Sequence, residues 1–467
     1  MKSFDVLIEE HFPVSRYQLM SLVVLCLVDL TDGGQLVTTS ISLPIIKEEM
    51  GLSATQVSLL SSLFYVGTAA GSLASGLSAD KLGRIFTLKR ALVMQIVCGL
   101  SFMFCNGFWS LLLVRFLYGG SYGFSLPMTP IYVIELFPLK NRGKFTVLIN
   151  FFVSVGKLYG AFLSMFFLDS FGTGNWRGLM AASTLLPIAI LIMVSLFLIE
   201  SPRFLLVQGR HQEFKAALDG ILRFNAKGEP YEQIRPDELE AVQAWALEEA
   251  RTTPHAKGEL SQLFKPDMIN ITTKITSAWF SLSFMFFGQL AVIPFWLGKG
   301  GGGLFSMVVA LLGEFPIVLL SLFLVENKRF GRKNTMIYFS LGCAAVNLFG
   351  PFVNESGLAM MMFASRFFMK GLFGIIYPFT SEVFPTRVRS LGYGFASSMG
   401  RVGACLMPFV LFPVFYAWPS MVFVIFAICA GVCLASVLAM PFDTTHRFLD
   451  HSEATEELVP VELKSTK

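Results

Sequence analysis

The chain has 467 residues, of which 54% are hydrophobic and 15% are charged, and its mean hydropathy is +0.64. Ordinary soluble domains carry about 25% charged residues, so this composition excludes a soluble globular protein and is typical of a membrane protein. The formal charge of +4 is spread over connecting segments, which argues against nucleic-acid binding. The seven cysteines lack CxxC or Cys/His ligand spacing, so no metal site is expected, and no cofactor loop or enzyme motif is visible.

Apolar stretches of roughly 20 residues, the length that crosses a bilayer core of ~30 Å, recur from one end of the chain to the other. They predict an all-α membrane protein with twelve transmembrane helices. The predicted helices are centred near Leu30, Val66, Val97, Phe124, Ser154, Leu191, Met285, Leu312, Phe339, Phe368, Ala404 and Ile428.

The orientation of these helices follows from lysine and arginine, which concentrate in short cytoplasmic loops. Four alternate connections are rich in them, whereas the intervening connections hold little beyond Lys47, Arg177 and Lys299. Both termini are therefore predicted to be cytoplasmic. The basic connections contain Lys81, Arg84, Lys89 and Arg90; Lys140, Arg142 and Lys144; Lys328, Arg329, Arg332 and Lys333; and Arg387 and Arg389.

A repeat organises the chain into two halves. The segment ELFPLKNR at 135–142 returns 247 residues later as EVFPTRVR at 382–389, and the Gly-Arg pair at 83–84 returns at 331–332. Such a parallel repeat is expected of a two-lobed transporter. We therefore predict two six-helix lobes, 1–200 and 271–440.

The two lobes are separated by one long polar segment, 201–270, which we expect to be a cytoplasmic linker. Within it, the spacing of Phe214, Ala217, Leu218, Ile221 and Leu222 favours short amphipathic helices, and a disordered linker is the alternative. The tail, 441–467, is charged and free of aromatic residues, so we expect a disordered cytoplasmic tail.

Polar side chains recur at helical spacing inside four of the predicted spans. An ionised group at bilayer depth costs several kcal/mol, so each such stripe should face a wet cavity or a partner. The stripes are Asp29, Asp32, Gln35 and Thr39 in the first span; Arg115, Tyr118, Tyr122, Ser125 and Thr129 in the fourth; Asn150, Ser154 and Lys157 in the fifth; and Arg366, Lys370, Phe373, Tyr377 and Thr380 in the tenth.

The charges inside the spans do not balance. Five basic residues (Arg115, Lys157, Arg366, Lys370 and Arg401) oppose three acidic ones (Asp29, Asp32 and Glu314). Arg115 is expected near the outer surface, and Glu314 is an expected structural partner for Arg366 and Arg401. That leaves Lys157 and Lys370 without a partner. A central lysine reaches neither interface easily and needs a carboxylate or an anionic ligand.

We therefore expect a small organic anion as the substrate, held by Lys157 and Lys370 with Tyr122, Phe373 and Tyr377 around its ring. Other substrate classes stay open: a zwitterion or cation on Asp32, inorganic phosphate, or a sugar. Asp32 could instead pair with Lys157 or Arg115 and only hold the lobe together. The complete expected substrate site is Asp32, Gln35, Tyr122, Lys157, Gln289, Lys370, Phe373 and Tyr377.

Several motifs resemble those of the major facilitator superfamily. The most specific is GLSADKLGR at 76–84, between the second and third spans. Others look like the group that holds synaptic-vesicle-glycoprotein-like proteins, organic-ion transporters and nicotinate permeases, with sugar and phosphate porters further away. These are ELFPLKNRG at 135–143, ESPRFLL at 200–206, GEFP at 313–316, EVFPTRVRS at 382–390, GRVGACLMP at 400–408 and MPFDT at 440–444.

The resemblance implies a monomeric carrier that binds a small molecule by alternating access, embedded in the lipid of the plasma membrane or an organelle membrane. It further implies that spans 1, 4, 7 and 10 line a central cavity. Three departures stand out: the Gln-Gln pair of sugar porters is missing from span 7, Lys328 replaces an aspartate, and Gln35 replaces the second acid of span 1. A membrane receptor or scaffold that has lost transport is therefore the alternative from another class.

The resemblance also implies gating contacts at the cytoplasmic helix ends. Asp80 and Arg84 are expected to bond the end of a neighbouring helix in one conformation. Further contacts are expected to brace the two lobes from the cytoplasmic side and to break as the lobes rock. These are the pairs Glu135 with Arg142 and Glu382 with Arg389.

Coupling is left open between proton symport and uniport. The five histidines all lie outside the predicted spans, so Asp29, Asp32 and Glu314 are the candidate proton carriers. Glu314 and Arg401 also belong to the expected gating set. Substrate identity and the direction of transport do not follow from the sequence.

Overall fold

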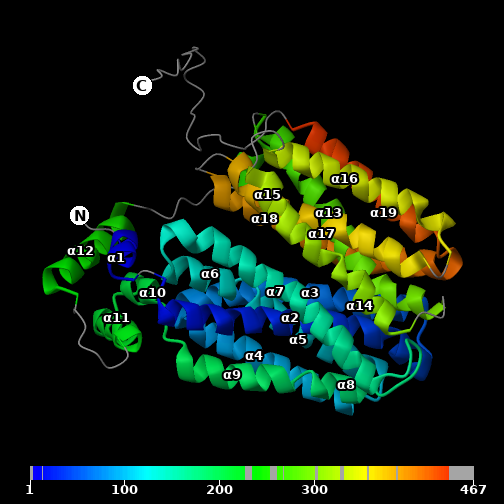
Figure 1. Cartoon of the computed structure of the whole chain (residues 1–467), viewed down its shortest axis with the longest axis horizontal. Coiled ribbons are helices and arrows are strands. Elements are labelled where there is room, and N and C mark those ends of the chain that lie inside the picture. Colours follow the sequence, from blue (N-terminus) through cyan, green and yellow to red (C-terminus); the bar gives the residue numbers. More distant parts are fainter. Residues whose placement is uncertain are drawn as a thin grey trace.

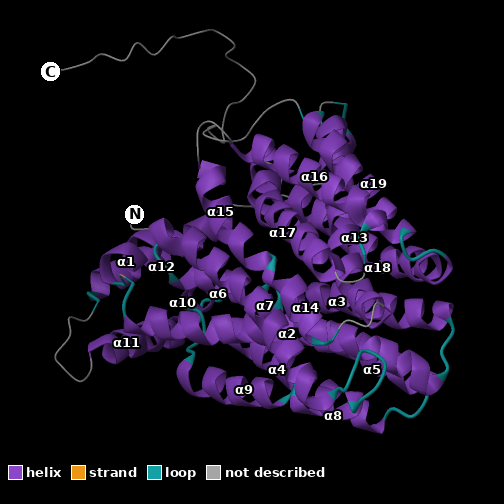
Figure 2. Ribbon diagram, turned by 45° about the vertical axis from the view of Figure 1, so that its right-hand side comes forward, coloured by secondary structure: helices purple, strands orange, loops and turns teal. Residues whose placement is uncertain are grey.

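The computed structural model describes residues 4–12, 14–226, 234–252, 260–266, 268–299, 303–326, 331–354, 357–384 and 388–440. Helices make up almost all of these ranges, and the described residues form no strand, only one isolated bridge between Leu168 and Gly174 (Figure 2). The predicted all-α fold is thereby confirmed. The predicted tail at 441–467 lies outside the described residues.

The helices form two bundles that are stacked as two layers (Figure 1). The N-terminal bundle contains α2 (Arg16–Met50), α3 (Ala54–Leu82), α4 (Arg84–Ser101), α5 (Phe108–Ser125), α6 (Met128–Leu136), α7 (Leu139–Phe167), α8 (Trp176–Ala182) and α9 (Leu185–Phe197). The C-terminal bundle contains α13 (Ile269–Lys299), α14 (Phe305–Leu312), α15 (Glu314–Glu326), α16 (Gly331–Phe349), α17 (Leu358–Val383), α18 (Arg389–Ala417) and α19 (Met421–Leu438).

Ten stretches within the described residues are long and apolar enough to cross a membrane. The other two predicted spans, the fourth and the eighth, each consist of two successive helices. α5 and α6 are separated at Leu126 and Pro127, and α14 and α15 are separated at Gly313. The proline lacks a backbone donor and so favours the first break.

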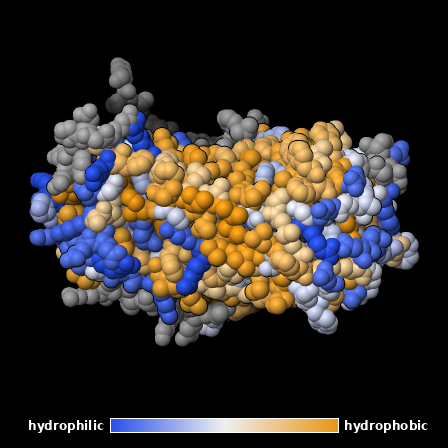
Figure 3. Space-filling view, turned by 90° about the horizontal axis from the view of Figure 1, so that it is seen from below, coloured by the Kyte–Doolittle hydropathy of each residue, from blue (hydrophilic) through white to orange (hydrophobic). Residues whose placement is uncertain are grey.

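The lower face of the N-terminal bundle has the surface of a membrane protein. Exposed apolar side chains on α4 and α9 include Val97, Ile192 and Leu196. Figure 3 shows a hydrophobic band over the middle of this face, with hydrophilic residues gathered at both ends. Such a band fits the apolar interior of a bilayer between two wet surfaces.

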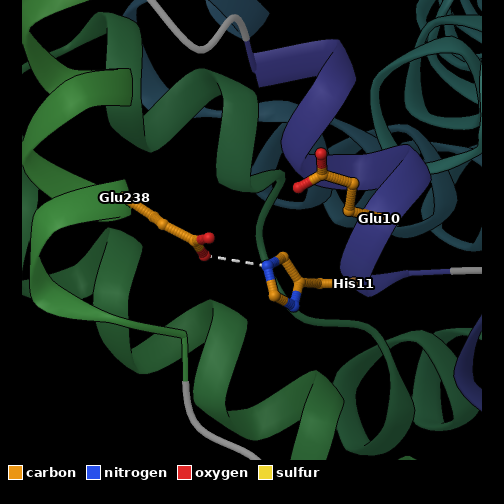
Figure 4. A group of neighbouring side chains, drawn as sticks. All are labelled: Glu10, His11 and Glu238. Atoms are coloured by element: carbon orange, nitrogen blue, oxygen red, sulfur yellow. Dashed lines mark hydrogen bonds and ion pairs between the residues drawn. The ribbon is translucent and has the colours of Figure 1, made fainter.

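Small helices cover one end of the N-terminal bundle, which we call the linker end. They are α1 (Phe4–His11), α10 (Pro202–Val207), α11 (His211–Ala226) and α12 (Pro236–Thr252); a short η2 (Leu260–Phe264) contacts α13. His11 Nε2 lies 2.9 Å from Glu238 Oε2 and ties α1 to α12 (Figure 4). Glu10 lies nearby, but Arg235 also bonds Glu238 at 2.7 Å. The cluster therefore serves as a clamp between helices.

The bundles meet in their middle and at the end opposite the linker, which we call the far end. There, Ser58 donates to the Pro408 carbonyl at 2.9 Å and Ser62 to the Cys405 carbonyl at 2.7 Å, which joins α3 to α18. Ser40 of α2 donates to the Leu290 carbonyl of α13. The helices of the C-terminal bundle incline toward the N-terminal bundle at this end (Figure 1).

Glycines bring the backbones of the N-terminal bundle into direct contact. A Cβ atom added at Gly33 of α2 would lie 2.0 Å from the Val153 carbonyl oxygen of α7, and one at Gly156 would lie 1.9 Å from the Leu30 carbonyl oxygen. The C-terminal bundle has glycines of both kinds: Gly403 lies close to the Phe280 carbonyl oxygen, whereas Gly371 packs against the Phe339 ring, each 2.6 Å from the position of such an atom. The α2–α7 seam therefore excludes even a methyl group.

Candidate functional site

A buried carboxylate joins the two bundles at the centre of the molecule. Glu314, at the start of α15, is fully buried, and both its oxygens accept from Lys157 Nζ of α7, at 2.7 and 2.8 Å. Ser154 Oγ donates to the same carboxylate at 2.7 Å, and Arg366 Nε of α17 donates at 2.8 Å. The predicted partnership of Arg366 with Glu314 is formed, and Lys157 shares it.

The break in the eighth span places this carboxylate. At Gly313, an added Cβ would lie 2.2 Å from the Phe363 carbonyl oxygen, so the chain passes close to α17 at this point. The next residue, Glu314, then starts a new helix beside Arg366. Gly313 lets the chain approach α17 closely, and Glu314 follows it as the first residue of α15. These two features together fix the position of the Glu314 carboxylate.

Lys370 lies one helical turn beyond Arg366 and has no carboxylate partner among the described residues. The residue is 8% exposed, and its Nζ donates to the Asn150 side-chain oxygen of α7 at 3.3 Å. Glu314 and Asp29 lie within electrostatic range. Lys370 therefore carries a charge that a ligand could meet directly.

Aromatic rings lie beside these cations. The Phe286 ring of α13 has Lys157 Nζ 4.5 Å and the Arg366 guanidinium 4.9 Å from its centroid, which are cation–π distances. Phe373 packs against Phe286 at 4.6 Å, and Tyr377 continues along α17. The predicted Lys157, Lys370, Phe373 and Tyr377 are therefore brought into one region.

Trp279 and Phe286 were not among the predicted site residues. Trp279 lies 4.9 Å from Tyr377, ring to ring, and its indole nitrogen donates to Thr380 at 2.8 Å. The two residues are seven positions apart, two helical turns, and so share a face of α13. This seven-residue spacing is the feature of the sequence that could have identified both as site residues.

The acidic residues of α2 face the N-terminal bundle. Ser125 Oγ donates to Asp32 at 2.5 Å, and Thr129 Oγ1 donates to Asp29 at 2.7 Å. Asp32 pairs with neither Lys157 nor Arg115, so the alternative of an ion pair with either is wrong. Lys157 instead forms an ion pair with Glu314, which comes from the other half of the chain.

The remaining predicted binding residues have no described hydrogen bond to Lys157, Arg366 or Lys370. Gln35 donates to the Tyr118 carbonyl, and Tyr122 stacks on Phe64 with ring centroids 6.2 Å apart, both inside the N-terminal bundle. Gln289 of α13 is fully buried, and neither of its amide atoms has a described partner.

The predicted gating residues form ion pairs within each bundle. Arg84 bonds Glu135 at 2.9 Å and lies 3.7 Å from Asp80. The repeat places the equivalent pair, Arg332 with Glu382, at the same point of the C-terminal bundle.

The expected pairing of Glu135 with Arg142 is not formed. Arg142 bonds Asp5 at 2.6 Å, and the Arg389 side chain lies outside the described residues. In this conformation Glu135 bonds Arg84 and Glu382 bonds Arg332, each within its own bundle, and the bracing of the lobes from the cytoplasmic side stays a prediction. Arg401 reaches across the bundles to Ser72 at 3.0 Å and does not bond Glu314.

Comparison with known proteins decides the family. A family model described as "Sugar (and other) transporter" matches residues 10–455. The chain belongs to this family of major facilitator transporters. The carrier is therefore an integral membrane protein that moves small molecules, and it is not an enzyme.

Three relatives and one solved structure illustrate the likeness. The carrier is 28% identical to the synaptic vesicle 2-related protein of Pongo abelii over 91% of this chain and 78% of that one. It is 25% identical to organic cation/carnitine transporter 7 of Arabidopsis thaliana (89% and 90% covered) and to the niacin transporter NiaP of Acinetobacter baylyi (86% and 88%). An inward-open structure of the xylose transporter XylE from E. coli superposes with a TM-score of 0.76 at 17% identity, covering 92% and 97%.

Proposed function

We propose that the carrier moves a small organic anion, such as an aromatic carboxylate, across the plasma membrane or an organelle membrane by alternating access. The observation that supports it is Lys370, a buried cation whose hydrogen bond among the described residues is to an amide oxygen. Around it lie Lys157 and Arg366, whose charges are met by the single carboxylate of Glu314. This region therefore holds more positive than negative charge.

The rings of Phe286, Phe373, Tyr377 and Trp279 form an aromatic wall, which suits a flat substrate. We expect a carboxylate bonded to Lys370 to place its ring beside Phe373 and Tyr377, which pack against Phe286 and Trp279 with ring centroids 4.6 and 4.9 Å apart. Arg366 Nη1 has no described partner and offers a second donor. Niacin, named for one relative, is a carboxylate of this kind.

The conformation fits a carrier open toward the cytoplasm. The hydrogen bonds that Ser58, Ser62 and Ser40 donate to the C-terminal bundle lie in the far half of the molecule, and the bond from Arg401 to Ser72 lies near its middle. With the linker end cytoplasmic, as the basic connections predict, the far end is the closed outer side. Rocking the bundles would break these bonds and form others at the linker end.

Glu314 acts as an internal lock in this mechanism. It bonds Lys157 of the N-terminal bundle and Arg366 of the C-terminal bundle at once. If a substrate carboxylate bonded Lys157 or Arg366 in place of Glu314, the contact between the two bundles would weaken. We propose Asp29 and Asp32 as the proton carriers, in a monomeric protein.

Counterflow into proteoliposomes tests the substrate class. Liposomes loaded with unlabelled nicotinate or benzoate are diluted into the labelled anion, with wild type, Lys370→Gln and the control Lys299→Gln. We expect Lys370→Gln to reduce exchange about 10- to 100-fold, the loss of one charge-assisted contact, and Lys299→Gln to leave it unchanged. Equal exchange by wild type and Lys370→Gln for every anion would overturn the assignment.

An organic cation is the second candidate, because Asp29 and Asp32 are each bonded to one hydroxyl and to no cation among the described residues. The same assay with carnitine and tetraethylammonium distinguishes it: exchange of a cation that is lost in Asp32→Asn would make the lysines structural. Failure of all tested solutes to exchange would favour a receptor or scaffold.

A further inference from the structure

A buried arginine without a counter-charge lies in the far half of the N-terminal bundle. Arg115 of α5 is 2% exposed, and its Nη2 donates to the Thr39 carbonyl of α2 at 2.9 Å. Its Nε has no partner, and it forms no ion pair with a described carboxylate. Desolvating such a charge costs several kcal/mol unless an opposite charge approaches it.

The guanidinium lines a small cavity at the junction of the two bundles. Thr39, Ser61 and Tyr65 also line the cavity and bring hydroxyl groups to it, and Ala291 of α13 closes it from the C-terminal bundle. Thr39 Oγ1 is buried and has no partner of its own. The cavity volume of about 20 Å³ exceeds the ~10–15 Å³ that one water molecule needs.

The lining of the cavity selects for an anion. An arginine offers only donors, and hydroxyl groups can donate as well, whereas no described carboxylate lines the space. Gln35, one turn before Thr39 on α2, presents an amide that bonds the Tyr118 carbonyl. A water molecule would satisfy hydrogen bonds here, but it would not neutralise the charge of Arg115.

We propose that this cavity binds a small inorganic monovalent anion, chloride or another halide, through Arg115 with the hydroxyls of Thr39, Ser61 and Tyr65. The site adjoins the proposed substrate region, because Tyr65 packs on Phe287 and that ring lies 6.1 Å from Phe373, but Lys370 does not line the cavity and the proposal does not depend on the substrate class.

The position of the site gives it a conformational effect. Ala291 is the residue after Leu290, whose carbonyl accepts from Ser40, so the cavity is complete only while α2 and α13 are joined at the far end. A bound halide therefore stabilises the conformation that is closed at the far end. Opening the far end would release it.

The test is the thermal unfolding of the full-length purified carrier in sodium chloride, sodium bromide and sodium gluconate at equal ionic strength. We expect chloride or bromide to raise the melting temperature of wild type by about 2 °C with a saturating dependence on concentration. Arg115→Gln should lose this dependence. In gluconate it should melt at or above the temperature of wild type, because it removes an uncompensated buried charge.

A second pair of variants keeps the charge and alters only the hydroxyls. Tyr65→Phe and Ser61→Ala should each raise the half-saturating chloride concentration about fivefold, while Ser101→Ala, a hydroxyl outside the cavity, should not. If Arg115→Gln does not fold, these variants decide the question. A halide effect that is absent from wild type, or that is unchanged in the variants, would overturn the site.

Discussion

On the N-terminal side of the central region, Asp29 and Asp32 are each held by one hydroxyl, whereas Glu314 on the C-terminal side is held by two cations and a hydroxyl. A hydroxyl donates to a carboxylate and accepts from a carboxylic acid, so the aspartates keep their partners in either protonation state. Lysine and arginine only donate. Glu314 therefore keeps its partners only as a carboxylate, which suits a lock between bundles and leaves proton transfer to the aspartates.

The largest expected effect tests the lock. Glu314→Gln leaves Lys157 and Arg366 buried without a carboxylate, and breaking a buried ion pair in this way costs about 3–5 kcal/mol. We expect a strongly lowered melting temperature and loss of counterflow. The exposed Glu48→Gln is the matched control, and wild-type exchange in Glu314→Gln would disprove the lock.

The next prediction concerns the aspartates. Asp32→Asn keeps the bond to Ser125 but removes a proton-binding group, so uptake driven by a pH gradient should fall at least ~10-fold while counterflow stays within ~3-fold. Asp29→Asn shows whether one or both acids carry the proton. Gradient-driven uptake that survives in both variants, or that a protonophore never affects in wild type, would favour uniport.

The duplicated pairs at the linker end allow a direct comparison of the bundles. Glu135→Gln removes one carboxylate partner from Arg84 and Glu382→Gln removes one from Arg332, so each should slow turnover about tenfold and change substrate affinity less than threefold. Transport rates and binding by calorimetry measure the two quantities separately. Equal losses in turnover and affinity would speak against gating.

The smallest effects come from single hydroxyls. Ser154→Ala removes one donor from Glu314 and should lower the free energy of unfolding by about 1–2 kcal/mol, because the carboxylate is charged. Ser125→Ala at Asp32 should cost a similar amount at high pH and less at low pH, where a protonated aspartate needs that donor less. Identical pH dependence of the stability of the two variants would contradict the proposed difference between the Asp32 and Glu314 carboxylates.

The helical fold, the repeat and the polar stripes could be predicted from the sequence because each depends on local spacing. The partner of Lys157 could not, since Glu314 lies in the other half of the chain, and periodicity does not say how two bundles dock. The breaks within the fourth and eighth spans could not be predicted either, because Leu126-Pro127 and Gly313 lie inside otherwise continuous apolar stretches. For Glu135 the sequence indicated the helix end but not the partner, because Arg84 lies on another helix than the expected Arg142.

The glycine seam between α2 and α7 bears on how this carrier could acquire new substrates. At Gly33 and Gly156, where the backbones of α2 and α7 touch, any side chain would force the helices apart. Substitutions at these two positions are therefore expected to destabilise the bundle and not to be accepted. Around Lys370, rings such as Phe339 and Phe373 fill the space, and a smaller or larger ring changes its shape at modest cost. We expect substrate preference to diversify through the C-terminal bundle, while the N-terminal bundle is inherited with little change.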